Sequence, residues 1–195
     1  HANVYINGQK VGYWPYGYNS FHFDITKYLK PGEKNTLAVR LENLPESSRW
    51  YPGAGLYRNV HLIITEDAYI PVWGTYITTP SVNEKFAKVN VRTKVVLPEG
   101  ADPAKYSVET SVWNPNKQKL TAVRTSLAQM KYNNNQAEQE FVIQAPSLWS
   151  PEMPALYSAE TRLYEGDKLK DIYTTPFGIR SIEIIPDKGF FLASD

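Results

Sequence analysis

Two pairs of carboxylates are spaced so that each could supply a general acid and a general base. Glu138 is followed two residues later by Glu140. In the same way, Glu165 is followed by Asp167. Residues two apart share one face of a strand, so each pair would lie side by side on a sheet. Nothing nearby suggests the apolar pocket that raises the pKa of an acid, and we interpret both pairs as solvated surface charge.

Other catalytic and metal-binding patterns are weaker. The three histidines, His1, His22 and His61, have no ligand spacing, and His22 or His61 would need a carboxylate from elsewhere in the fold to bind a metal. The chain has no cysteine, which excludes disulfides and thiol nucleophiles. Gly-x-Ser-x-Gly and a glycine-rich phosphate loop are both absent. The sequence therefore predicts neither a cofactor nor a metal site.

The aromatic residues allow two interpretations. Tyr13, Trp14, Tyr16 and Tyr18 crowd one turn region. Aromatic faces with polar edges stack well on sugar rings, so the cluster could contact a glycan. It could also pack against protein that lies outside this sequence, and this is the interpretation that we favour. Trp113 and Trp149, in contrast, are expected in the core or at a seam of a later domain.

The bulk composition excludes several classes of partner. The 195 residues carry 21 lysines and arginines against 20 acidic residues, a formal net charge of +1. This balance, with scattered basic residues, gives no reason to expect nucleic acid or an anionic membrane. No apolar run approaches the roughly 20 residues of a transmembrane helix. The absence of cysteine is compatible with cytoplasm, periplasm or secretion, so the compartment stays open.

The elements that would position these residues are strands. The chain has 14 prolines and 14 tyrosines, and no stretch sustains a helical apolar period. In the first region, Asn7-Gly8 predicts a hairpin turn, because both positions tolerate positive φ. Further strands are expected over 17–26, where Asp24 can cap the following turn, over 36–41 after a turn at Pro31-Gly32, and over 59–64. These strands form an open set with little core of their own.

The second region predicts a more complete sandwich. Val89, Val91, Thr93 and Val95 alternate with polar residues, giving one dry and one wet face, and 106–112 repeats the pattern. Later strands are expected over 120–127, 138–143, 156–164 and 168–174. About seven short strands separated by turn residues favour an immunoglobulin-like sandwich, here without the hallmark cysteine pair.

Five segments, taken in order, carry a resemblance to a known family. They are 4–12 (VYINGQKVG), 17–26 (GYNSFHFDIT), 49–60 (RWYPGAGLYRNV), 148–151 with 154–157 (LWSP, PALY) and 177–180 (FGIR). The chain resembles the β-galactosidase and β-glucuronidase group of glycoside hydrolase family 2. The resemblance covers nearly the whole chain.

The resemblance implies a domain layout. Residues 1–67 would be the end of a jelly-roll sugar-binding domain, part of a sandwich whose other strands lie upstream. Residues 68–177 would be an immunoglobulin-like β-sandwich, and 178–195 the entry to a (β/α)₈ barrel that this sequence does not include. The expected fold class is therefore all-β. His1 and Ala193-Ser194-Asp195 are not assigned as native or foreign, and Ala193-Ser194-Asp195 departs from the family's usual Asn-Gly-Lys.

The resemblance also implies an activity for the parent protein. That activity is hydrolysis of a β-glycosidic bond with retention, by two glutamates of the barrel, so this chain alone is expected to be inactive. Its loop Arg49-Trp50-Tyr51 is the candidate substrate-binding site. Alternatively, Arg49 and Arg58 would form structural ion pairs while Trp50 fills a seam between domains. The sugar is expected to be galactose from the likeness of 49–60. A stand-alone carbohydrate-binding or adhesion module is the rival interpretation. Expected partners are a carbohydrate substrate, the protein's own barrel and, through exposed strands, a second copy of the chain.

Overall fold

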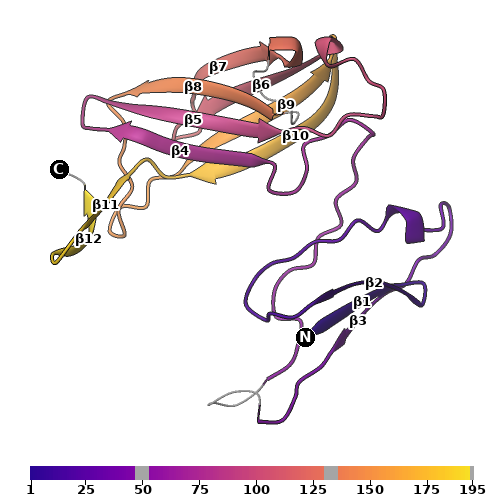
Figure 1. Ribbon diagram of the computed structural model, residues 1–195. Coiled ribbons are helices and arrows are strands. Elements are labelled where there is room, and N and C mark those ends of the chain that lie inside the picture. Colours follow the sequence, from indigo (N-terminus) through magenta and orange to yellow (C-terminus); the bar gives the residue numbers. More distant parts are fainter. Residues whose placement is uncertain (47–52, 130–135, 194–195) are drawn as a thin grey trace. The chain divides into compact units, whose positions relative to one another are not determined.

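The computed structural model describes residues 1–46, 53–129 and 136–193 of the chain (Figure 1). The chain divides into two compact units, His1–Leu62 and Ile63–Asp195, which are described separately below. The described residues form strands and three short 3-10 helices, so the predicted all-β class is confirmed. Among these residues, no helix has the length and apolar character that crossing a bilayer requires.

The first unit contains a three-stranded antiparallel sheet in the order β2-β1-β3. Its strands are β1 (Ala2–Ile6), β2 (Gln9–Trp14) and β3 (Leu37–Leu41), and a 3-10 helix, η1, spans Thr26–Tyr28. The predicted turn between β1 and β2 is confirmed, because Asn7 and Gly8 have φ values of 51° and 80°. The side-chain amide of Asn7 also donates to the carbonyl of Tyr28 and to Asn35 Oδ1, and these bonds connect the turn to the loop before β3.

Two predicted strands of this unit are wrong. Residues 17–25 run without strand pairing, although the predicted cap is present, since Asp24 Oδ1 accepts from the Thr26 amide at 2.9 Å. Residues 59–64 are likewise outside the sheet. Both segments alternate in sequence, but a strand also needs a neighbouring strand to satisfy its backbone groups, and the three-stranded sheet provides none to them.

The second unit is a sandwich of seven strands. One sheet has four strands in the order β10-β9-β6-β7, and the other has three in the order β4-β5-β8. The strands are β4 (Thr75–Val82), β5 (Phe86–Lys94), β6 (Tyr106–Trp113), β7 (Lys119–Ser126), β8 (Gln136–Gln144), β9 (Tyr157–Glu165) and β10 (Lys168–Phe177). Two further 3-10 helices, η2 (Pro103–Lys105) and η3 (Leu127–Gln129), flank β6 and β7. The sheets face each other in Figure 1 and confirm the predicted sandwich.

The core of the sandwich has a polar layer across its middle. The predicted dry face is confirmed, because Val89, Val91 and Thr93 of β5 and the following Val95 are all buried. One apolar cluster gathers around Val91, Val112 and Phe141, and a second around Val95, Val108 and Leu163. Four buried polar residues, one from each of β5, β6, β8 and β9, occupy the intervening positions: Thr93, Thr110, Gln139 and Thr161.

A two-stranded hairpin follows the sandwich. Its strands are β11 (Ser181–Ile185) and β12 (Gly189–Ala193), paired antiparallel. In Figure 1 the hairpin projects away from the two sheets. Ile182, Ile184 and Phe190 are exposed on it.

Candidate functional site

The predicted substrate-binding residues, Arg49, Trp50 and Tyr51, lie outside the described residues. The chain on either side, up to Glu46 and from Gly53, belongs to the first unit.

The carboxylate pairs have solvated or ion-paired surroundings. Glu138 lies 3.6 Å from Arg92, and Glu140 lies 3.7 Å from Lys88, both across the ladder between β8 and β5. All four side chains are substantially exposed. Their interpretation as surface charge therefore agrees with the geometry.

The second carboxylate pair is not a pair on one strand. Glu165 is the last residue of β9, whereas Asp167 lies in the turn before β10, because Lys168 pairs with Glu165. The expectation that both share a strand face is wrong, since the hairpin turns between them.

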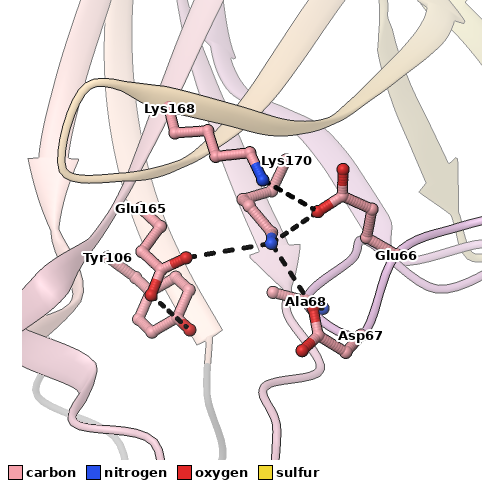
Figure 2. Close-up of polar contacts among 7 residues, drawn as sticks. All are labelled: Glu66, Asp67, Ala68, Tyr106, Glu165, Lys168 and Lys170. Atoms are coloured by element: carbon pink, nitrogen blue, oxygen red, sulfur yellow. Dashed lines mark hydrogen bonds and ion pairs between the residues drawn. The ribbon is translucent and has the colours of Figure 1, made fainter.

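The most concentrated cluster of charges in the second unit surrounds Lys170 on β10 (Figure 2). Its ammonium lies 2.5 Å from Glu66, 3.4 Å from Asp67 and 3.8 Å from Glu165, and its side chain is only 8% exposed. Lys168 adds a contact to Glu66 at 3.7 Å. Figure 2 shows Tyr106 on the far side, where its hydroxyl donates to Glu165 at 3.4 Å.

The electrostatics of this Lys170 cluster favour anchoring rather than acid-base chemistry. The hydrogen bond to Glu66 raises the pKa of Lys170 to about 12. The same lysine lowers the pKa of Glu66 and of Asp67, because its ammonium donates a hydrogen bond to each carboxylate and so favours the charged form. Burial, with the Glu165 charge, raises the pKa of Tyr106. These shifts hold Lys170, Glu66, Asp67 and Tyr106 in their ordinary charge states at neutral pH, which does not favour proton exchange by these four groups.

The cluster begins a line of contacts along β10. The Ile70 amide donates to Asp171 Oδ2 at 2.8 Å, and the Trp73 amide donates to the Tyr173 hydroxyl at 3.0 Å. The Thr75 and Thr175 hydroxyls also bond. Residues 66–75 are thereby fastened to side chains of the edge strand of the four-stranded sheet. No local pattern predicts these contacts, because the partners lie about a hundred positions apart.

Removing the Lys170 charge is expected to make the free energy of unfolding depend less on pH in the acid range. The lowered pKa values of Glu66 and Asp67 contribute stability that is present above their unfolded pKa, near 4, and is lost as pH falls through the folded values. Lys170 contributes stability that is lost only as pH rises through about 12. We expect K170M to lower the urea midpoint of unfolding at pH 7. Between pH 5 and pH 3 we expect this midpoint to decrease less in K170M than in the unchanged chain. K168M is the matched control, because Lys168 is exposed, and an equal effect of K168M would contradict the anchoring role.

A second junction lies where the chain leaves the sandwich. The Trp149 amide donates to the carbonyl of Ile179 at 2.8 Å, and the Arg180 guanidinium carbon lies 4.6 Å from the centre of the Trp149 ring. Thr79 Oγ1 donates to the Arg180 carbonyl at 2.8 Å. Trp149 is half-buried at this seam, as expected, and the contacts fix the chain just before β11.

The aromatic residues of the first unit separate into two groups. Trp14 stacks on Phe21, with centroids 5.7 Å apart, and Tyr13 stacks on His1. Tyr16 and Tyr18 are exposed and touch edge to face. Part of the predicted cluster is therefore packed within the unit, and part is open. Within the described residues, no group of three or more histidine, aspartate or glutamate side chains could hold a metal ion.

Comparison with known proteins decides the family. Residues 69–180 match the family model described as glycosyl hydrolases family 2. The chain belongs to this family. The match contains β10, which carries Lys170, and the Trp149–Arg180 seam.

The family 2 relatives are much longer than this chain. It is 38% identical to beta-galactosidase BoGH2A of Bacteroides ovatus over 98% of the chain and 22% of that protein. It is 37% identical to a putative beta-glucuronidase of Formosa agariphila over 98% of the chain and 18% of that protein. A family 2 glycosyl hydrolase structure from Bacteroides cellulosilyticus superposes with a TM-score of 0.84 at 33% identity, covering 98% of this chain and 24% of that one. The chain thus spans about a fifth of the length of these relatives.

Proposed function

We propose that this chain is the non-catalytic N-terminal region of a retaining exo-β-glycosidase that hydrolyses terminal β-galactosides. In this proposal residues 1–67 end a jelly-roll domain, 68–177 form the sandwich, and 178–195 enter a catalytic (β/α)₈ barrel. The observation that carries it is the family match over 69–180 in a chain that spans only 22% of BoGH2A.

The chemistry would belong to two glutamates of the barrel. A retaining glycosidase needs a nucleophile and an acid/base about 5–5.5 Å apart, and it forms and then hydrolyses a covalent glycosyl intermediate. Glu66, Glu138 and Glu140 of this chain instead face lysine or arginine side chains. The described region would serve as scaffold, anchored at its entry by Lys170 and at its exit by Trp149.

The loop Arg49-Trp50-Tyr51 would contribute to substrate binding. An arginine can donate several hydrogen bonds to sugar hydroxyls, and an aromatic pair can cover a ring face. The loop belongs to a segment, 49–60, whose likeness to galactosidases supports galactose as the sugar, as does the BoGH2A relative. Glucuronide is the competing sugar, because relatives named beta-glucuronidase are similar over the same span.

The function is tested with p-nitrophenyl β-galactoside and the matching β-glucuronide. We expect the full-length protein to hydrolyse the galactoside with a kcat/KM at least tenfold above that for the glucuronide, and we expect the 195-residue chain to hydrolyse neither. Turnover by the 195-residue chain at enzyme-like rates would contradict the scaffold role. Preference of the full-length protein for the glucuronide would overturn the choice of sugar.

A stand-alone carbohydrate-binding or adhesion module is the second candidate. The exposed tyrosines of the first unit favour it, since they offer a ligand surface without a catalytic centre. The gene sequence beyond residue 195 separates the two candidates. About 250 further residues of alternating strands and helices support the enzyme, and a stop codon near Asp195 supports the module.

A further inference from the structure

Two asparagine side chains join separate segments of the first unit. The side-chain nitrogen of Asn7 donates to the carbonyl of Tyr28 at 3.0 Å and to Asn35 Oδ1 at 2.8 Å. Its oxygen accepts from the Thr36 amide at 3.0 Å. These bonds connect the turn after β1 to the end of η1 and to the residues that precede β3. The hydrogen bonds of Asn7 and Asn35 are called the asparagine network below.

Asn35 has one favoured orientation in this network. Its Oδ1 also accepts from the Lys30 amide at 2.9 Å, and its side-chain nitrogen donates to the carbonyls of Lys30 and Glu33, each at 3.0 Å. Both hydrogens and both acceptor sites of the Asn35 side-chain amide are therefore in use. Rotating this amide by half a turn would set its NH2 group against the Lys30 N–H and its oxygen against two carbonyls. The group of Asn35 that faces position 7 is therefore fixed as an oxygen.

Asn7 is followed by Gly8, and these two neighbours can react with each other. The Gly8 backbone nitrogen can attack Cγ of Asn7, because glycine has no Cβ to hinder the approach. The new N–C bond closes a succinimide ring while the bond between Cγ and the side-chain nitrogen breaks, and that nitrogen leaves as ammonia with the proton of the Gly8 amide. Water then adds across one of the two ring C–N bonds, which leaves aspartate or isoaspartate at position 7. The reaction consumes only water and needs neither an oxidant nor a cofactor.

In the folded unit the asparagine network opposes this reaction. Ring closure expels the side-chain nitrogen of Asn7, so the bonds that this nitrogen makes to Tyr28 and Asn35 must break. The reactive molecules are therefore those in which this region has opened locally. Each hydrogen bond lowers the open population roughly twofold to tenfold. We propose that Asn7 is a site of spontaneous deamidation that the asparagine network protects, and that the modified residue no longer holds residues 28–36.

The product of deamidation lacks the donors on which the network depends. A carboxylate only accepts hydrogen bonds, whereas the Asn7 side chain donates two. The new oxygen would face the Tyr28 carbonyl and the fixed Asn35 oxygen, so two hydrogen bonds become two repulsive contacts. Isoaspartate also adds a carbon to the backbone inside the turn. All members of the network belong to the first unit, so this consequence does not depend on which of its surfaces are covered.

The test compares deamidation at Asn7 in the folded full-length protein and in urea. The protein is incubated at mildly alkaline pH and digested with trypsin, and the peptide that ends at Lys10 is followed by mass spectrometry. We expect aspartate and isoaspartate at position 7 to form about tenfold faster, or more, in urea than in the folded protein, because two bonds must break. Equal rates would overturn the protection by the network, and an Asn7 that stays intact even in urea would overturn the site.

The role of the network is tested with N35A. This variant removes one acceptor of Asn7 and leaves the reacting pair unchanged, so we expect it to raise the rate in the folded protein roughly twofold to tenfold. The matched control is N114A, which removes an asparagine that also organises a turn, through bonds to Gln118 in the second unit. We expect N114A to leave the rate at Asn7 unchanged. Equal rates for folded N35A and N114A would overturn the proposal.

The effect of the modification is tested with N7D, which carries the carboxylate that deamidation creates. N19D is its control, because it adds the same charge at an exposed residue of the same unit outside the network. We expect the backbone amides of residues 28–36 to exchange hydrogen faster in N7D than in the unchanged protein, and N19D to leave their exchange unchanged. Equal exchange in N7D and N19D would overturn the release of this segment. Mass and hydrogen exchange are measured without turnover, so both results are independent of whether the proposed function holds.

Discussion

Gly178→Ala is expected to lower the free energy of unfolding of the sandwich by about 1–3 kcal/mol, the usual cost of overpacking a filled site. A Cβ on Gly178 would lie 2.8 Å from Cγ of Trp149 and 2.9 Å from its Cβ and Cδ1. The ring cannot move away freely, because the Trp149 amide is bonded to Ile179 and Arg180 stacks on the indole. Backbone strain adds nothing, since Gly178 is not among the residues with positive φ. Urea unfolding monitored by circular dichroism measures the change.

A double-mutant cycle isolates the contact with Trp149. In the W149A background the extra methyl has open space, so G178A should cost less than about 0.5 kcal/mol there. An equal cost in both backgrounds would show that Gly178 is required for another reason. Gly55→Ala is the outside control, because a Cβ there meets no atom within 4 Å.

The sandwich could be predicted from sequence wherever burial imposed strict alternation. From Ala87 through β5 to the following Val95 every second residue is buried, and Lys88, Arg92 and Lys94 between them are exposed. The turn at Asn7-Gly8 was predictable for a local reason, since both residues adopt positive φ. These signals need no knowledge of distant partners.

Strand β4 was missed for an equally physical reason. It contains Pro80, and its pairing with β5 shifts register between Thr78 and Ser81. As the edge strand of its sheet it can accommodate a proline at an irregularity, and its residues are half-buried or exposed rather than alternating. Conversely, 59–64 alternates convincingly but lacks a neighbouring strand in the described sheet. Alternation of apolar and polar residues shows which face of a strand would be buried. It does not show whether a neighbouring strand is present to pair with it.

The contacts of Lys170 and of Tyr57 could not be predicted from the sequence. Glu66 and Lys170 approach to 2.5 Å only because residues 66–75 run along β10. Tyr57 meets Gly17 across 40 positions. Which of many charged or aromatic residues pair at such separations depends on the three-dimensional course of the loops, which no local pattern encodes.

Gln139→Leu is expected to destabilise the sandwich by about 1–3 kcal/mol, although leucine is apolar and of similar size. The Gln139 amide nitrogen donates to the carbonyl of Val108 at 3.1 Å, to the carbonyl of Val123 at 2.9 Å and to Thr125 Oγ1 at 3.1 Å. It therefore joins β8 of one sheet to β6 and β7 of the other. Leucine would remove the donor that bridges the two sheets, and we expect the loss of these bonds inside the core to exceed the gain from added apolar contact.

The size of the effect also depends on a polar atom that is already unsatisfied. Gln139 Oε1 and Thr93 Oγ1 are buried without a hydrogen-bond partner among the described residues. Leucine removes the first of these, which recovers part of the loss and sets the expected cost below that of a fully bonded buried amide. Gln144→Leu is the matched control, because Gln144 ends the same strand and is exposed. We expect the urea midpoint of unfolding to be well below that of Q144L for the Q139L chain. A Q139L chain as stable as Q144L would mean that apolar packing, and not the polar layer, holds the two sheets together at this level.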